Sequence, residues 1–149
     1  MWLNTMRFIS LLCTALALCA AMAHVFELPN KIILSKEHYA VVQQIYKGWA
    51  LLGIAVVMAI ISTLAVVIMV RHRRKVFSLT LIALLCIVAT QIIFWVWTYP
   101  VNQQTINWTI LPANWLELRR QWEYSHAVSA GFDLIALSTL VLSLLVTDD

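Results

Sequence analysis

The sequence has few of the charged residues that keep a protein soluble in water. Only 11% of the 149 residues are charged, while 62% are hydrophobic. Soluble domains average roughly a quarter charged and half apolar residues, so too few polar side chains are present to cover a surface that faces water. The net charge of +3 is also too small for the basic surface of a nucleic-acid-binding domain. The composition therefore excludes an ordinary soluble domain, a disordered tail and a DNA or RNA partner.

Cysteine is also scarce, and its spacing carries no known motif. The three cysteines are Cys13, Cys19 and Cys86, all within apolar runs and without CxxC spacing. The sequence therefore predicts neither a disulfide framework nor a thiol redox pair.

Long apolar runs are present instead. They predict four membrane spans, at approximately 6–26, 48–70, 76–99 and 124–147, each suited to a helix that crosses about 30 Å of hydrocarbon. We expect a single all-α domain over 1–149, an integral membrane four-helix bundle whose partner is the lipid bilayer. The cell membrane is the expected location, which in a bacterium is the cytoplasmic (inner) membrane.

Local signals predict where these helices begin and end. Ser35 can cap a helix that starts before the second span, so an amphipathic turn or two is expected to precede the membrane. Pro100 follows an aromatic belt and is expected to end the third helix. Asn114 and Glu117 have the spacing of a capping box, which predicts that the fourth helix starts outside the lipid.

The first apolar run has two interpretations. Arg7, a Leu/Ala-rich stretch and Ala21-Met22-Ala23 match the regions of a signal peptide, whose cleavage would leave His24 as the N-terminus. The retained-helix interpretation is favoured, because the residues just after this run resemble part of a site that the helix itself would build.

Basic residues predict the orientation. The short turn 71–75 contains four Lys or Arg residues between the two clearest spans, which indicates the cytoplasmic side. Both termini are then cytoplasmic, and the segments 27–47 and 100–123 face the outside.

Polar residues at the outer end are candidates for chemistry. His24 and Glu27 share a helical face if the first helix continues that far, and they could bind a metal or move a proton. The alternative is that both simply anchor a helix end at the interface.

A polar stripe on the fourth helix is the stronger signal. Arg119, Glu123, His126, Ala130 and Asp133 follow spacings of three or four residues and extend into the apolar depth. Ionisable groups at membrane depth usually mark a site or a proton path. A purely structural role, with Arg119 and Glu123 paired and Asp133 bonded to a neighbouring helix, stays open.

Two outer segments carry a family resemblance. HVFELPNKI (24–32) and YPVNQQTINWTILPANWLELRRQWEYSHA (99–127) resemble the anthrone oxygenase-like family of small four-helix membrane proteins. Most of its members have no assigned function, and those with one oxidise an anthrone to an anthraquinone without a classical cofactor. The matching pattern consists of His24, Glu27, Tyr46, Trp49, Pro100, Asn102, Trp108, Arg119, Trp122, Glu123 and His126.

The resemblance implies one outer pocket for a hydrophobic small molecule, with no cofactor and no metal ligand set. In this hypothesis His126, oriented by Glu123 or Glu27, deprotonates a phenolic or enolic substrate that then reacts with oxygen. His24 belongs to the same catalytic group. The substrate-binding candidates are Asn102 and Arg119 for the developing oxyanion, Trp122 as an apolar wall, and Trp49 and Tyr46.

Two other functions remain open from the sequence. His24 and His126 could ligate a metal or haem between the first and fourth helices, and cleavage before His24 would create a copper-chelating N-terminus. Alternatively the protein is a non-catalytic accessory subunit or carrier whose polar stripe keeps the helices in register.

Overall fold

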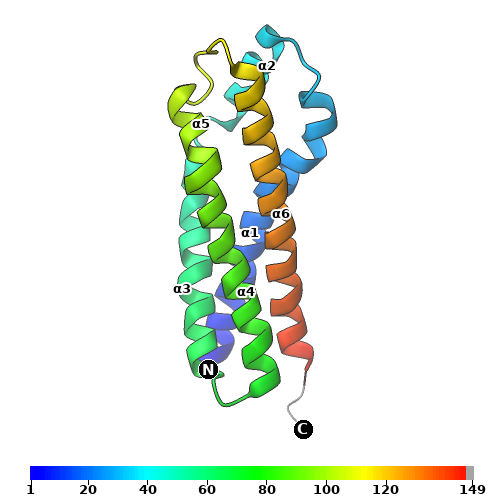
Figure 1. Ribbon diagram of the computed structural model, residues 1–149. Helices are drawn as coiled ribbons and strands as arrows, with labels where there is room; N and C mark the ends of the chain where they lie inside the picture. The colour runs from blue at the N-terminus through cyan, green and yellow to red at the C-terminus, as the bar shows by residue number, and fades with distance from the viewer. Residues whose placement is uncertain (147–149) are drawn as a thin grey trace.

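The computed structural model describes residues 1–146, and this part of the chain contains helices and no strand (Figure 1). The predicted fourth span ends at Thr147, which lies outside the described residues. In chain order the elements are α1 (Trp2–Lys31), α2 (Lys36–Gln43), the 3₁₀ helices η1 (Gln44–Tyr46) and η2 (Trp49–Leu52), α3 (Gly53–Met69), α4 (Arg74–Ile93), the π-helix η3 (Phe94–Thr98), α5 (Tyr99–Gln104) and α6 (Trp115–Leu145).

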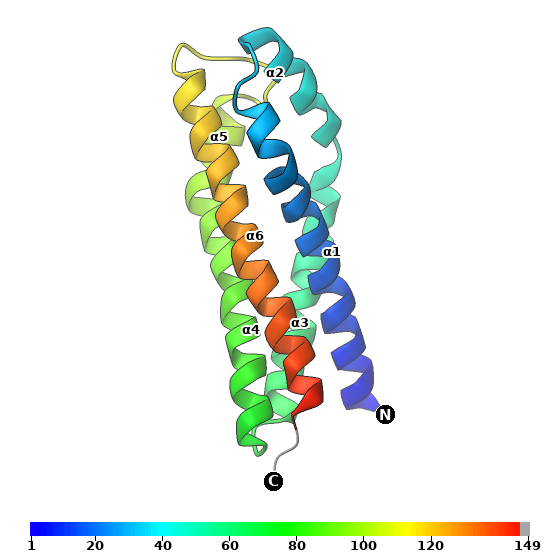
Figure 2. The ribbon, with the colours of Figure 1, turned by 90° about the vertical axis from the view of Figure 1, so that its right-hand side faces the viewer.

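Four stretches of helix in this structure are long and apolar enough to cross a membrane. They cover Trp2–Lys31, Trp49–Met69, Arg74–Gln104 and Trp115–Leu145. The long helices form an elongated bundle in which α1 packs on α3 and α6, and α4 packs on α3 and α6 (Figures 1 and 2). The all-helical architecture with four helices long and apolar enough to span a membrane, expected from the sequence, is therefore confirmed, while the assignment of sides stays a prediction.

The two ends of the bundle differ. The N-terminus and the basic turn 71–75 lie at one end, here called the basic end, and α2 and α5 lie at the other, here called the cluster end (Figure 1). The first helix continues through Pro29 to Lys31, so the expected outer segment 27–47 is partly helix α1. His24 and Glu27 therefore share one helical face.

The second helix is interrupted where the sequence predicted continuity. Ser35 caps α2 as expected, because its Oγ accepts a hydrogen bond from the His38 backbone N–H at 3.4 Å. The chain then bends at Gly48, whose φ of 92° is in the left-handed region that glycine adopts without a Cβ clash. The amphipathic turns before the membrane are thus a separate helix joined to α3 by the bend.

Pro100 does not end the third helix, contrary to the prediction. The π-helix η3 precedes it, and the Tyr99 N–H bonds to the carbonyl of Phe94 five residues back. Pro100 then lies in the first turn of α5, where a missing N–H breaks no helical hydrogen bond. The helical path therefore continues to Gln104.

The capping box before α6 was also a wrong prediction. Helix α6 starts at Trp115 as the pattern indicated, but the Asn114 side chain makes no capping hydrogen bond. Its φ of −89° and ψ of 22° are not the extended values of a side-chain N-cap, and only its backbone carbonyl accepts from Glu117 and Leu118.

The half of the bundle that extends from the histidines His24 and His126 to the basic end is here called the lipid-crossing half. Its interior is lined by small and hydroxyl-bearing side chains, and large apolar side chains point outward. Ala59, Ala83 and Ala136 are fully buried in one packed cluster with Ile87 and Leu140. Small residues let membrane helices approach closely, which supplies packing where no hydrophobic effect acts between helices.

Candidate functional site

A largely buried group of charged and phenolic side chains connects four elements, α1, α2, η1 and α6, at the cluster end. We call Glu27, Lys31, Tyr39, Tyr46 and Glu123 the lysine cluster. The Lys31 Nζ lies 2.5 Å from the Tyr46 hydroxyl, 3.1 Å from Glu123 Oε1 and 3.4 Å from Glu27 Oε2. Lys31 and Glu123 are only 3% and 1% exposed, so this ion pair is shielded from water. A buried charge pair of this kind stabilises a fold only where further hydrogen bonds complete it.

Two tyrosines complete the lysine cluster. The Tyr39 hydroxyl, from α2, donates to Glu123 Oε1 at 2.8 Å and accepts from Gln43. The Tyr46 hydroxyl donates to Glu27. Burial and the adjacent Glu123 carboxylate raise the pKa of Tyr39 far above its usual value, and burial with the hydrogen bond to Glu27 does the same to the pKa of Tyr46. Both phenols are therefore held as hydrogen-bond donors to the carboxylates.

Two imidazoles stack beside the lysine cluster. The rings of His24 and His126, here called the histidine stack, have centroids 4.1 Å apart and planes inclined by 26°. Trp122 lies 4.9 Å from His24 and 4.3 Å from His126, centroid to centroid, and Tyr46 and Trp49 lie 4.5 and 5.7 Å from His24. Nδ1 of His24 is buried and has no hydrogen-bond partner among residues 1–146. An unsatisfied polar atom in an aromatic enclosure marks a place where a polar ligand group or proton could bind.

Helical spacing explains why these side chains meet. His24, Glu27 and Lys31 follow one another at three and four residues along α1, and Glu123 and His126 do so along α6. Because α1 and α6 pack side by side, the two faces meet. The segment around Gly48 then brings Tyr46 and Trp49 over His24.

Arg119 and Asn102, two of the predicted substrate-binding residues, lie beside the lysine cluster and the histidine stack and hold neighbouring groups in place. Arg119 donates to the carbonyl of Leu34 at 2.8 Å and stacks over the Trp115 ring, 4.7 Å from its centroid. Asn102 accepts a 2.8 Å hydrogen bond from the Trp122 indole N–H and so fixes that ring. Arg119 therefore faces the loop after α1, while Lys31 is the cation nearest the histidine stack.

Lys31, Tyr39 and Gln43 are members of this site that sequence reasoning missed. Lys31 stands four residues after Glu27, the spacing of an ion pair on one helix, so this spacing was the signal that could have found it. Tyr39 and Gln43 have the same spacing on α2. Only the fold brings α2 back against Glu123, so no local pattern could have identified that partner.

Asp133, the last residue of the predicted stripe, is separate from this site. It lies two helical turns beyond His126 toward the basic end and is 5% exposed. The thiol of Cys86 on α4 lies in its neighbourhood.

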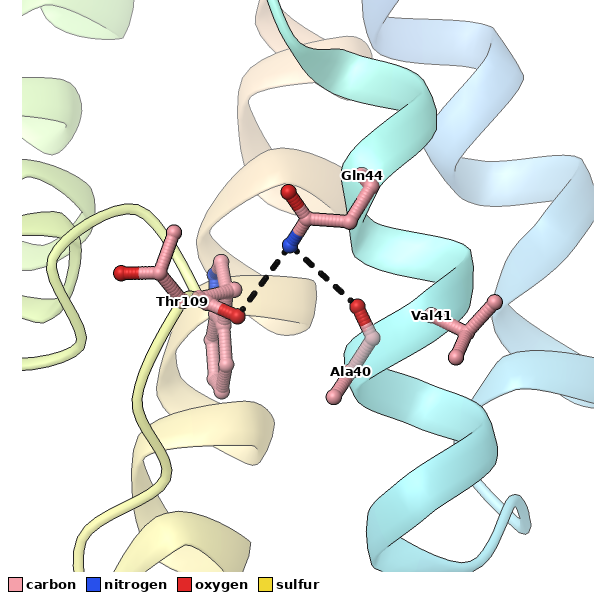
Figure 3. Close-up of a pocket in the computed structure, with 5 residues that line it drawn as sticks. Ala40, Val41, Gln44 and Thr109 are labelled. Atoms are coloured by element: carbon pink, nitrogen blue, oxygen red, sulfur yellow. Dashed lines mark hydrogen bonds between the residues drawn. The ribbon is translucent and has the colours of Figure 1, made fainter.

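A shallow depression at the cluster end lies outside the histidine stack (Figure 3). Ala40, Val41, Gln44, Trp108 and Thr109 line it, and the Gln44 side-chain amide donates to the carbonyls of Ala40 and Trp108, both at 3.3 Å. A second depression is lined by Tyr99, Asn102, Gln103, Ile106 and Asn107. Neither includes His24 or His126; His24 is buried, at 5% exposed, and His126 is partly exposed.

The loop that covers this end is strained. Ile106, Asn107 and Trp108 have φ values of 46°, 52° and 63°, which are unfavourable for residues with a Cβ. The Trp108 ring is buried 5.0 Å from Tyr39 and 6.0 Å from Trp122, centroid to centroid. Burial of this ring holds the loop in its strained conformation.

Within residues 1–146 no three His, Cys, Asp or Glu side chains come together in an arrangement that could hold a metal ion. No family model, curated protein or solved structure matches the chain. The functional proposal therefore rests on the side chains themselves. Two imidazoles, of His24 and His126, lie among aromatic rings beside the buried Lys31 ammonium and the Glu123 carboxylate that holds it.

Proposed function

We propose that the cluster end is a closed active site that oxidises a hydrophobic phenol or enol with molecular oxygen, as the resemblance to anthrone oxygenases implies. The observation that carries this proposal is the histidine stack, with its unpartnered His24 Nδ1, next to the buried Lys31. Histidine is the side chain that most often acts as a general base. Three aromatic rings around them, of Tyr46, Trp49 and Trp122, suit a flat apolar substrate.

The first step is proton removal. An imidazole of the histidine stack takes the proton of an acidic C–H or O–H of the substrate, and the Lys31 ammonium stabilises the resulting oxyanion. Lys31 therefore takes the role that the sequence assigned to Arg119. Glu123 and Glu27 keep Lys31 in place.

The second step is reaction of the electron-rich anion with oxygen. For an anthrone-type CH₂ group the overall change is CH₂ + O₂ → C=O + H₂O, in which the carbon is oxidised and one oxygen atom is reduced to water. Both protons leave with that water, so the imidazole returns to its neutral form. The balance needs no further reductant.

Substrate entry requires part of the enclosure to move. Tyr46 and Trp49 belong to the segment around Gly48, which carries two 3₁₀ turns in place of regular α-helix. Such short turns have weaker hydrogen-bond geometry than an α-helix. We infer that a substrate dissolved in the lipid enters by displacing this segment.

The stacked geometry argues against joint metal ligation. The lone pairs of imidazole nitrogens lie in the plane of the ring. The two ring planes are inclined by only 26° and are therefore nearly parallel. Those lone pairs do not converge on one point, so a metal or haem shared by His24 and His126 would need the rings to rotate.

Oxygen uptake tests the proposal. Detergent-purified protein is incubated with a panel of anthrones and hydroxylated naphthalenes, and oxygen consumption is recorded for the wild type, His126→Ala and the matched control His38→Ala, in which an exposed histidine of α2 is removed. General bases contribute typically 10²–10⁴-fold, so we expect a loss of about 10²-fold or more in His126→Ala alone. Equal turnover in the three proteins would refute the assignment of His126.

A non-catalytic role is the second candidate, and the close packing favours it. Aromatic rings fill the space around the histidine stack, and the lysine cluster joins α1, α2 and α6 as a structural connection would. In this case no substrate of the panel is oxidised, and Lys31 variants lose stability without any activity to lose.

A further inference from the structure

Asp133 lies inside the bundle on the face of α6 that also carries His126. Seven residues separate them, two helical turns or about 10 Å along the axis. The Asp133 side chain is 5% exposed and makes no hydrogen bond or ion pair with another residue of the described range 1–146. A carboxyl group at membrane depth is costly unless it carries a proton or faces a counter-ion. Its presence therefore calls for a function.

An unpartnered hydroxyl lies in the same layer of the bundle. Cys13 of α1 and Phe132 of α6 pack against one apolar cluster that includes Cys86 of α4. Counted from the stacked His24 and His126, residue 14 of α1 and residue 133 of α6 lie within about one helical turn of each other along the bundle. Thr14, the next residue on α1, is fully buried, and its hydroxyl has no hydrogen-bond partner within residues 1–146. The carboxyl group of Asp133 and the hydroxyl group of Thr14 thus lie at a similar depth of the bundle, and neither makes a hydrogen bond within residues 1–146.

Hydrogen-bonded hydroxyl pairs continue from this layer in both directions. Toward the basic end, Ser10 stands one turn before Thr14 on the same buried face of α1 and bonds to Thr63 of α3 at 2.7 Å. Toward the cluster end, Ser125 bonds to Thr98 at 2.8 Å, immediately beside His126. Buried hydroxyl groups that both donate and accept can pass a proton along.

We propose that Asp133 binds a proton inside the membrane and exchanges it between the histidine stack and the Ser10–Thr63 pair, so that the protein conducts protons along the bundle. A proton is the ligand that a single carboxyl group can hold, whereas a hard metal cation takes six or more oxygen ligands. Chains of ionisable groups within membrane bundles serve as proton relays. Proton conduction shares the histidine stack with the proposed oxidation but does not require it, and the Asp133 variants separate the two because Asp133 takes no part in that oxidation.

Passive proton flux tests the inference on the full-length protein. Purified protein is reconstituted into liposomes that contain a pH-sensitive dye, and a potassium diffusion potential set by valinomycin drives proton entry. We expect vesicles with the wild type to acidify several-fold faster than protein-free vesicles. Asp133→Asn should return to the protein-free rate, and Thr14→Val should lie between the two.

Three controls make the result decisive. Ser138→Ala changes an exposed residue of the same helix and should conduct like the wild type. Asp133→Glu keeps the carboxyl group, so it should conduct even if Asp133→Asn does not reconstitute as a folded protein. Wild-type flux equal to that of protein-free vesicles, or folded Asp133→Asn that conducts like the wild type, would overturn the proposal.

Discussion

The two halves of the bundle are held together by different means. At the cluster end, long polar and aromatic side chains from α1, α2 and α6 meet around Lys31, and each contact depends on a particular functional group. In the lipid-crossing half, α3 and α4 pack through alanines and hydroxyl-bearing residues, where the volume of a side chain decides the fit. The stability of the cluster end should therefore depend on charge and protonation. The stability of the lipid-crossing half should depend on side-chain volume.

The largest expected effect follows from removing the cation of the lysine cluster. Lys31→Met leaves Glu123 buried without its charged partner, which typically costs about 3–5 kcal/mol. The midpoint of thermal unfolding in detergent should therefore fall strongly. Lys47→Met, at an exposed lysine, is the matched control and should leave the midpoint nearly unchanged.

A second variant tests whether the loss is electrostatic. Glu123→Gln in the Lys31→Met background removes the uncompensated charge, so part of the lost stability should return. If Lys31→Met unfolds at the wild-type temperature, the ion pair contributes nothing and the description of this end is wrong.

The next largest effect is expected in the lipid-crossing half. Ala59 is 0% exposed in its packed cluster, so Ala59→Leu forces α3 away from its neighbours at a cost of about 1–3 kcal/mol. Ala50→Leu, at an exposed position, should cost little. The two unfolding midpoints, compared in the same detergent, measure how far volume controls this half, and equal midpoints would contradict it.

Alkaline pH should destabilise the cluster end. The pKa values of Tyr39 and Tyr46 are raised, so the folded protein keeps these phenols protonated while the unfolded chain loses their protons above the ordinary value of about 10. The stabilisation that the two phenols contribute is therefore fully present below about pH 10. It declines as the pH rises toward their folded-state pKa values, by up to about 1.4 kcal/mol per pH unit for each group.

Tyrosinate absorbance and unfolding measured together check the alkaline effect. The slope of stability above about pH 10 should be smaller in a Tyr39→Phe, Tyr46→Phe double variant than in the wild type. The same slope in both proteins would show that these phenols are not protected.

The smallest expected effect concerns the cap of α2. Ser35→Ala removes the hydroxyl that accepts from the His38 N–H, an exposed contact of 3.4 Å, and should cost about 0.5 kcal/mol. Amide hydrogen exchange should quicken in α2 and stay unchanged in α3. A loss comparable to that of Lys31→Met would mean that α2 supports the cluster far more than its contacts indicate.

Sequence patterns predicted some features and missed others for identifiable reasons. Hydropathy found the four apolar helices, because in lipid nearly every outward position must be apolar and every backbone group must bond within its own helix. Local rules failed at Pro100 and Asn114, where a π-helical turn and a backbone carbonyl replaced the usual signals. Whether a π-helical turn or a backbone carbonyl takes the place of the expected signal depends on how neighbouring segments pack.

The sequence by itself determined an all-helical chain with four helices long and apolar enough to span a membrane and with polar residues on particular helix faces, since helical period and hydrocarbon thickness act locally. Only the tertiary structure decided that Lys31 is the cation at the centre, that Tyr39 reaches Glu123, and that His24 stacks on His126. Tyr39 and Glu123 are 84 residues apart, and His24 and His126 are 102 residues apart, and the two members of each pair belong to different helices. Their meeting depends on helix packing and on the bend at Gly48, which no local pattern contains.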